Sequence, residues 1–389
     1  MGYIASIQLP PKGFIVRRFI ELSVMYLRGV EIVGDKLVIT SCRDLCIELE
    51  RILSTLGDRN VYLTGNDVRG IITRIATLLG VSSGGRALAT DLLKSLVDVI
   101  KARVSTECIT KDLIETRLTP INLFKSNFYE YGRVYLARPA TRYVGLEKIP
   151  VFLQLLGMLG ALLADAGRVR RDDEVIHYYV LPPEGISSDL IASSITDVVK
   201  KHKVAVRMLN RFASAPRALY VIKLSAELIK LGYTSDEVVA ELVSIQEGRN
   251  RATIMSVEPL STEGLVSLIL LAGRSGRELA ERLSTLAEVA IESLNSRAEV
   301  EHRNGDLITR MASDLITYAR TCSLDALYSI ASTLMRLTEQ VRRASTDASR
   351  YLTNRIKGKG ISEPANWLAE LAELTSRLMN VCLAEAPVR

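Results

Sequence analysis

Histidine and cysteine are scarce in this chain of 389 residues. The three histidines stand at positions 177, 202 and 302, and none belongs to a metal-binding HExxH motif or a GxSxG nucleophile elbow. The five cysteines form no CxxC pair, so the usual zinc and dithiol redox motifs are excluded. We therefore expect that the protein is not an enzyme and has no catalytic residue, no metal and no cofactor.

Long apolar runs are also missing. The most apolar stretch, residues 149–164, spans about 16 residues, whereas a helix that crosses a bilayer needs about 20, so we expect a buried helix there. The N-terminus lacks the basic region and the apolar core of a signal peptide. The lack of a CxxC pair and the odd number of cysteines favour a mostly reduced chain. We expect a cytoplasmic protein with no membrane partner.

The chain does contain enough apolar sequence for a folded protein. Hydrophobic residues make up 48% of it, and the length allows two or three domains. We expect an α+β fold with an N-terminal α+β domain over 1–118, a central mixed α/β domain over 119–260 and a C-terminal helical bundle over 261–389.

The first 65 residues predict alternating strands and helices. Strands are expected at 3–9 and 60–63, helices at 14–27 and 45–56, and a hairpin turn at Gly34. This order, βαββαβ, is that of a ferredoxin-like fold, which many RNA-binding domains and many unrelated proteins share.

The later part of the chain is dominated by helical spacing. A helix is expected at 236–246 with Ser235 as its N-cap, followed by a strand at 251–257. The expected helices of the C-terminal bundle lie at 262–272, 275–297, 306–320, 323–356 and 363–385.

Basic residues gather near the middle of the chain. The totals are 50 basic and 44 acidic residues, yet residues 198–226 contain seven bases and no acid. Such a field attracts polyanions, because each neutralised phosphate releases counterions. The alternative is a solvated helical face that meets acidic residues elsewhere, and His202 adds at most a weak cation. The side chains expected to hold phosphate are Lys200, Lys201, Lys203, Arg207 and Arg211.

Aromatic residues form only 5% of the chain, but six of them fall within residues 124–143, where bases alternate with them. Aromatic rings stack on unpaired bases while arginine binds the backbone, so this composition suits a groove for single-stranded nucleic acid. The same alternation fits a half-buried strand. The side chains expected to contribute are Lys125, Tyr129, Tyr131, Arg133, Tyr135, Arg138 and Arg142. At an expected turn further on, phosphate or base-edge contacts are expected from Arg249, Asn250 and Arg251.

One acidic cluster offers an enzymatic alternative. Carboxylates could hold Mg²⁺ for nuclease chemistry, and four lie close together at Asp165, Asp172, Asp173 and Glu174. Arginines alternate with them, however, so a self-neutralised turn needs no metal. His177 follows in a strand-like run, where we expect a structural role.

Three segments together resemble a known family. They are the glycine-bearing apolar helix QLLGMLGALLADAG, the strand YYVLPP and the run IQEGRNRATIMSVEPLSTEGLV before a helical tail. They are similar to the Csa-type large subunit of archaeal subtype I-A CRISPR interference complexes, which are known as Cascade.

The resemblance implies a non-catalytic subunit of a ribonucleoprotein that serves antiviral defence. Its partners would be guide RNA, target DNA with its short flanking motif, and other protein subunits. The alternatives are a Mg²⁺-dependent nuclease that uses the acidic cluster and a protein-only helical scaffold.

Overall fold

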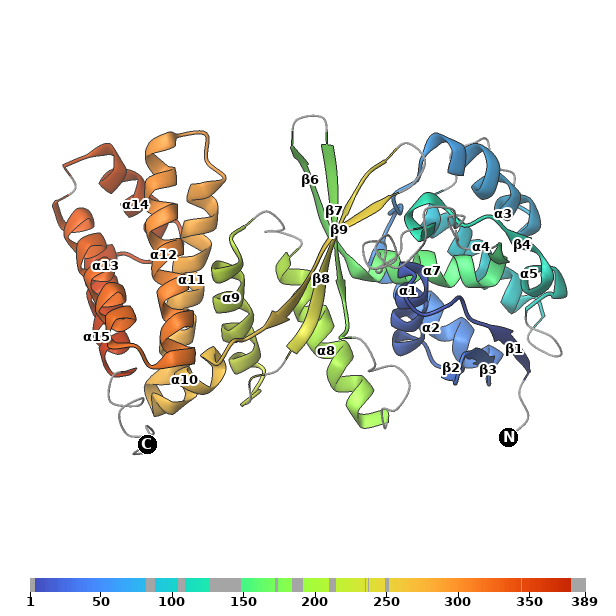
Figure 1. The fold of residues 1–389 in the computed structure, drawn as a ribbon, viewed down its shortest axis with the longest axis horizontal. Coiled ribbons are helices and arrows are strands. Elements are labelled where there is room, and N and C mark those ends of the chain that lie inside the picture. The colour runs from blue at the N-terminus through green and yellow to red at the C-terminus, as the bar shows by residue number, and fades with distance from the viewer. Residues whose placement is uncertain are drawn as a thin grey trace, which may run out of the picture. The chain divides into compact units, whose positions relative to one another are not determined.

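The protein is described here by a computed structural model, drawn in Figure 1. The residues that the structure describes are 4–81, 88–103, 109–125, 148–171, 174–183, 192–209, 215–234, 236, 238–248, 252–343 and 345–378. Helices and strands both contribute, and the expected α+β class is confirmed. The chain forms two compact units, Met1–Val206 with Ala240–Glu258, and Arg207–Val239 with Pro259–Arg389. The first unit therefore joins residues on both sides of position 118.

The first unit begins with a small antiparallel sheet. Its strands, in the spatial order β1-β3-β2, are β1 (Ala5–Gln8), β2 (Val30–Val33) and β3 (Lys36–Ile39). Helix α1 (Ile15–Tyr26) lies between β1 and β2 in the chain, and α2 (Cys42–Leu56) follows β3. The hairpin expected at Gly34 is therefore confirmed.

The expected ferredoxin-like order is wrong. Residues 60–63 belong to no sheet, and β1 pairs antiparallel with β3, where a split βαβ unit would place two strands in parallel. Polar groups of this segment bind the N-terminus of α4 (Ala89–Lys101) instead. Asn60 Oδ1 accepts from the Ala89 N–H at 3.0 Å, and the Arg59 carbonyl accepts from the Thr90 hydroxyl at 3.1 Å.

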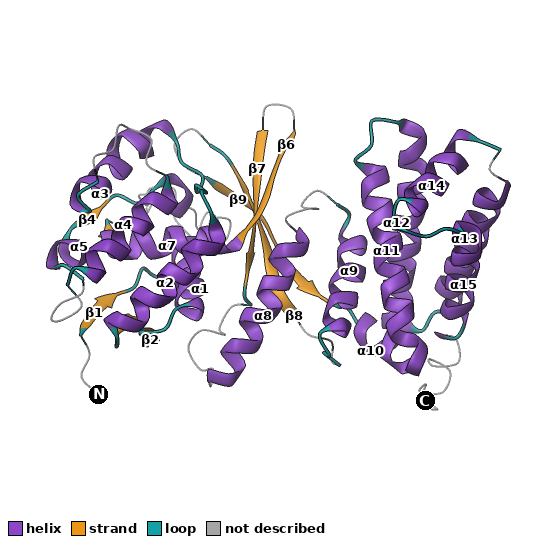
Figure 2. Cartoon of the chain, turned by 180° about the vertical axis from the view of Figure 1, so that it is seen from behind, coloured by secondary structure: helices purple, strands orange, loops and turns teal. Residues whose placement is uncertain are grey.

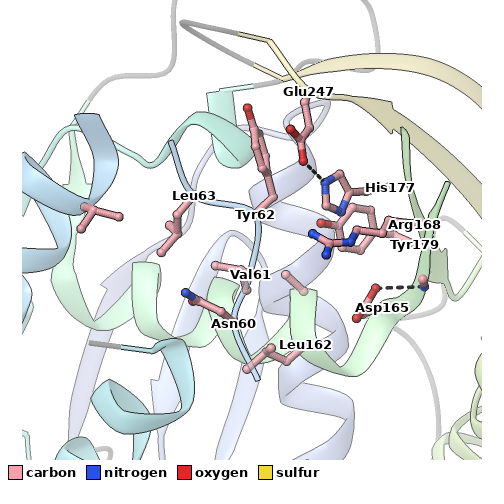
Figure 3. A pocket seen from close by; sticks show the side chains of 13 residues that line it. Asn60, Val61, Tyr62, Leu63, Leu162, Asp165, Arg168, His177, Tyr179 and Glu247 are labelled. Carbon is pink, nitrogen blue, oxygen red and sulfur yellow. Dashed lines mark hydrogen bonds and ion pairs between the residues drawn. The ribbon is translucent and has the colours of Figure 1, made fainter. Parts of the chain in front are cut away.

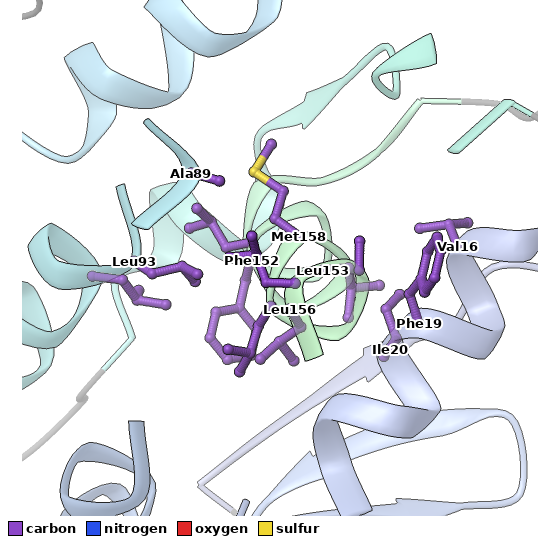
Figure 4. Close-up of a cluster of buried hydrophobic side chains, with 14 of the residues drawn as sticks. Val16, Phe19, Ile20, Ala89, Leu93, Phe152, Leu153, Leu156 and Met158 are labelled. Carbon is purple, nitrogen blue, oxygen red and sulfur yellow. The ribbon is translucent and has the colours of Figure 1, made fainter. Parts of the chain in front are cut away.

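Helix α7 (Val151–Ala164) forms the centre of the first unit, and all but one of its residues are buried. Figure 4 shows it between α1, which contributes Phe19 and neighbouring side chains, and α4, which contributes Leu93. Gly160 permits this close approach, since a Cβ there would lie 1.9 Å from the carbonyl oxygen of Phe19. The buried helix expected from the apolar run is confirmed. In the part of the chain that the structure describes, no helix is long and apolar enough to cross a membrane.

Short elements connect these helices. They are the π-helix η1 (Asp67–Ile72), α3 (Thr73–Leu78), α5 (Lys111–Glu115), the 3-10 helix η2 (Asn122–Lys125) and the paired strands β4 (Arg117–Leu118) and β5 (Ile149–Pro150). The buried carboxylate of Asp67 accepts from the N–H groups of Thr64 and Asn122, at 2.9 and 3.1 Å. These bonds attach η1 to η2.

A second sheet has the strand order β6-β7-β8-β9. Its strands are β6 (Asp165–Arg171), β7 (Glu174–Leu181), β8 (Val238–Gln246) and β9 (Thr253–Ser261), with α8 (Ala192–Leu209) between β7 and β8 in the chain. The helix expected at 236–246 is wrong, because residues 238–246 form β8. Most of its residues are buried on both faces, so its apolar residues do not alternate with exposed ones, and periodicity alone cannot distinguish such a run from a buried helix.

The second unit is mainly helical, as the purple ribbons of Figure 2 show. Its helices are α9 (Arg217–Lys230), α10 (Leu265–Leu271), the 3-10 helix η3 (Gly273–Ser275), α11 (Gly276–Leu294), α12 (Glu299–Thr321), α13 (Leu324–Arg343), α14 (Asp347–Lys357) and α15 (Pro364–Ser376). They enclose a hydrophobic core of their own. The single helix expected at 323–356 is wrong, because Thr346 caps a new helix there. Thr346 Oγ1 accepts from the Ser349 N–H, and Ser349 Oγ accepts from the Thr346 N–H.

Two cysteines differ from the expected reduced state. Cys42 and Cys322 each take part in a disulfide bond. Cys46 is a free, buried thiol. A single free thiol is enough to make the number of cysteines odd, so the odd count was a poor guide to the others.

Candidate functional site

A cavity of about 500 Å³ lies beside the second sheet, within the first unit (Figure 3). Its walls come from the extended segment 60–63, the C-terminal end of α7 and the adjoining parts of β6 to β8. Small-molecule sites typically measure about 300–1,000 Å³, so the cavity is of suitable size for a small ligand. The polar and aromatic side chains of its wall include Asn60, Tyr62, Arg168, His177, Tyr179 and Glu247.

His177 connects the polar and aromatic sides of this cavity. Its Nε2 lies 2.6 Å from Oε1 of Glu247, which accepts the hydrogen bond. Its ring lies beside that of Tyr62, with 5.2 Å between centroids, and is nearly parallel to that of Tyr179 at 6.3 Å. The bond to Glu247 agrees with the expected structural role. The Nδ1 atom makes no hydrogen bond with a described residue and can meet a ligand.

The hairpin of β6 and β7 places these groups together. His177 and Tyr179 are two residues apart on β7, so both face the same side of the sheet. Arg168 lies opposite His177, and Asp165 lies opposite Tyr179. Between these pairs the register shifts at Gly167, whose φ of +104° lies in the region that favours glycine. Asp165 Oδ1 accepts from the Gly167 N–H at 3.0 Å, which holds the bulge.

Both tyrosine hydroxyls of the cavity remain protonated. Burial raises the pKa of Tyr179, and the nearby carboxylates of Asp165 and Glu247 raise it further. Burial also raises the pKa of Tyr62, whose hydroxyl donates to the Gly248 carbonyl at 2.9 Å. The Tyr179 hydroxyl, in a residue that is 3% exposed, makes no hydrogen bond with any described group. It is therefore a donor in the cavity wall that lacks a protein partner within the described chain.

One arginine, Arg168, lines the cavity. Arg170 stands two residues further along β6 and does not line it, and both side chains are exposed. Neither forms an ion pair with a carboxylate of the described residues. Both guanidinium groups are thus available to an anionic partner.

The described flanks of two segments expected to bind nucleic acid are linked by hydrogen bonds, and Tyr62 of the cavity wall binds one of these flanks. Gly248, held by Tyr62, directly precedes residues 249–251, and Ala252 directly follows them. The Ala252 N–H donates to the Asn122 carbonyl at 3.4 Å, and Asn122 Oδ1 accepts from Lys125 Nζ at 2.8 Å. Lys125 is the first of the residues expected in the aromatic segment. The described flanks of both segments therefore meet at η2.

The remaining expected residues of these two segments, and one from the basic stretch, lie outside the described residues. They are Tyr129, Tyr131, Arg133, Tyr135, Arg138, Arg142, Arg211, Arg249, Asn250 and Arg251.

The basic stretch proves largely compensated in charge. Of its six described bases, four pair with carboxylates: Lys201 with Asp197 at 2.9 Å, Arg207 with Glu227 at 3.1 Å, Arg217 with Glu263, and Lys223 with Glu288. Asp197 and Glu227 stand immediately on either side of the acid-free stretch in sequence. Lys200 and Lys203 are exposed and form no ion pair with a described carboxylate. None of the described residues of this stretch lines the cavity.

His202, within this stretch, is not a cation. Its Nδ1 accepts from the Tyr26 hydroxyl at 2.7 Å, and its Nε2–H donates to the Val180 carbonyl at 2.8 Å. Burial lowers the pKa of His202 to about 4. The ring is neutral at pH 7 and serves to join α8 to α1 and β7.

The acidic cluster is spread along the β6–β7 hairpin. Asp165 lies opposite Tyr179, whereas Glu174 lies opposite Arg171, near the turn. Strands rise about 3.3 Å per residue, so Asp165 and Glu174 lie roughly 15–20 Å apart. These two carboxylates cannot bind one ion. Asp172 and Asp173 lie outside the described residues.

Sequence reasoning missed most of the cavity wall. Asn60 and Tyr62 were expected within a strand, Arg168 within a self-neutralised turn, and Glu247 just beyond a helix. The spacing of His177 and Tyr179 on one strand face was the available signal, since it indicated that these two side chains share a wall.

Comparisons with known proteins do not identify the chain. No protein-family model matches it, and no curated protein shows significant sequence similarity to it.

Proposed function

We propose that this protein is a nucleic-acid-binding subunit of an RNA-guided interference complex, with no covalent step of its own. The observation that carries the proposal is the meeting of three features in the first unit: the cavity with its aromatic wall, Gly248 and Ala252, which flank residues 249–251 in the chain, and the start of the aromatic segment at Lys125. The bond between Ala252 and Asn122 and the bond between Tyr62 and Gly248 bring them together.

The chemistry of these features suits a single strand. Arginine binds phosphate in a planar, bidentate manner, and aromatic rings stack on unpaired bases. In RNA-guided complexes, base pairing reads the sequence while the protein holds the backbone and reads a short flanking motif. The chain's proposed partners are therefore guide RNA, target DNA and the other protein subunits of such a complex, in the cytoplasm.

The test is a salt titration of nucleic-acid binding to the full chain, measured by fluorescence anisotropy with single-stranded and duplex oligonucleotides. Each phosphate contact adds about 0.7 to the slope of log K against log salt for single strands. We expect the double substitution Arg168→Ala and Arg170→Ala to reduce this slope by about 1.4. The matched control, Arg336→Ala with Arg342→Ala, removes the same charge from α13 and should leave the slope unchanged.

The basic stretch is tested in the same assay. Lys200→Ala with Lys203→Ala should lower the slope if α8 also holds phosphate, and these two residues are preferable to Lys201, whose removal would leave Asp197 without its ion pair. Absence of binding to any oligonucleotide at low salt would contradict the proposed function.

A protein-only scaffold is the second candidate. Helix α13 exposes the apolar side chains of Leu324, Tyr328 and Met335, with Tyr328 78% exposed. Exposed apolar surface of this kind suits a protein partner. This alternative predicts that the chain binds no nucleic acid at moderate salt but associates with a protein through α13. Tyr328→Ser would then abolish the association.

A further inference from the structure

We propose that the cavity beside β6 and β7 receives one unpaired nucleobase of the bound strand, with the phosphate of that nucleotide on Arg168. The inference rests on the proposed function and specifies which part of the strand this site recognises. The ligand chemistry is a base joined to a phosphate, and the source is an unstacked nucleotide within a strand.

The aromatic wall is prepared for stacking. Tyr62 is half-buried, its ring packs beside His177 at 5.2 Å, and its hydroxyl is held by the Gly248 carbonyl. A ring fixed at both its face and its tip loses little freedom when a base stacks on it. Every base has a π-face, so such a platform accepts any of the four.

The cavity also offers hydrogen-bonding groups that the described protein does not use. His177 Nε2 is engaged by Glu247, which leaves Nδ1 without a described partner. Asn60 Oδ1 is engaged by the Ala89 N–H, which leaves its NH₂ group as a donor. The Tyr179 hydroxyl is a second donor with no described partner. The polar edge of a base presents the complementary mixture of acceptors and donors, whereas a hydrocarbon ligand would leave all three groups unsatisfied.

Charge places the phosphate at the rim rather than inside. The carboxylates of Asp165 and Glu247 both line the cavity, so its interior disfavours a free anion. Arg168, at the edge and without an ion pair among the described residues, suits the phosphate that follows an inserted base. An inorganic anion alone would meet two acidic groups and one base. A nucleotide separates its neutral base from its charged phosphate in the way the site requires.

The experiment compares a single-stranded oligonucleotide with an abasic strand of equal length and charge, using the full chain and fluorescence anisotropy. Tyr62→Ala should weaken binding of the normal strand by about 5- to 150-fold, the range of one lost base stack. It should leave binding of the abasic strand unchanged. Tyr62→Phe, which keeps the ring, should retain most of the affinity and controls for folding.

Tyr179→Phe provides an independent measurement, because it removes only an oxygen atom. It should weaken binding of the normal strand by about 2- to 13-fold, the cost of one hydrogen bond, and again spare the abasic strand. Wild-type protein that binds normal and abasic strands equally, with no effect of either substitution, would overturn the inference while leaving the proposed function intact. A nucleoside monophosphate that fills the site without displacing the strand would also overturn it. Failure of wild-type protein to bind either strand would refute the proposed function itself.

Discussion

Gly160 of α7 lies against the backbone of α1, so a single methyl group there affects how the two helices can pack. A Cβ at Gly160 would meet backbone atoms of Phe19, which cannot rotate away. We expect Gly160→Ala to lower the free energy of unfolding by about 1–3 kcal/mol, the usual cost of overpacking. Gly70, in η1, has no atom within 4 Å of a Cβ position. Gly70→Ala should therefore be neutral or stabilising by up to about 1 kcal/mol. Urea denaturation compares the two variants, and equal effects would contradict the close-approach argument.

His202 should make stability depend on pH. Its pKa is lowered from 6.5 to about 4 in the folded protein, so between these values the unfolded chain binds more protons than the folded one. Stability is therefore greatest above about pH 6.5 and falls as the pH drops towards 4, by up to about 3 kcal/mol. His202→Gln should be less stable at pH 7 but should lose the His202 part of this decline. His302→Gln, at a partly buried position, is the control and should retain the full decline. An unchanged profile in His202→Gln would show that other groups cause it.

At the scale of helices and strands, sequence patterns were reliable where one local signal dominated. The apolar run predicted α7, and the β-branched residues around Gly34 predicted the β2–β3 hairpin. Prediction failed where contacts with distant parts of the chain determine the secondary structure. Residues 60–63 have the composition of a strand, but they bind the N-terminus of α4. Val239, Ala240, Leu242 and Val243 of β8 are buried although consecutive residues of a strand point to opposite faces, and this burial on both faces depends on elements distant in the chain.

Helix α10 shows how a distant side chain completes an element. It begins without a cap of its own, and Asp236 accepts hydrogen bonds from the N–H groups of Val266 and Ser267 and from the Thr262 hydroxyl. Although burial opposes the charge, these bonds outweigh it and lower the pKa of Asp236. We expect Asp236→Ala to reduce the free energy of unfolding by about 1–2 kcal/mol, and Asp236→Asn by less, because an amide oxygen still accepts. Asp325 lies in the first turn of α13 without a hydrogen bond to a described residue. Asp325→Ala serves as the control in chemical denaturation, and a loss equal to that of Asp236→Ala would argue against a capping role.

For the whole molecule, the candidate site could be predicted only in part. Composition identified residues 249–251 and the aromatic segment, and the structure brings their described flanks together at η2. The cavity could not be predicted, since its wall combines Tyr62, Arg168 and Glu247 from segments separated by about 100 and 80 residues in the chain. The uncompensated positive charge of the basic stretch was overestimated from the sequence, because two carboxylates that pair with its bases, Asp197 and Glu227, stand just outside it.

The two compact units have separate hydrophobic cores, one centred on α7 and the other within α9 to α15. A protein with two cores need not unfold in one step, because each core can melt at its own temperature. We expect differential scanning calorimetry to show two transitions. Gly160→Ala should lower the midpoint of one of them and Asp236→Ala that of the other, since these residues belong to different units. Their controls, Gly70→Ala and Asp325→Ala, should move neither midpoint by a comparable amount. If both Gly160→Ala and Asp236→Ala shift a single common transition, the units unfold as one cooperative structure, and the two cores do not have independent stability.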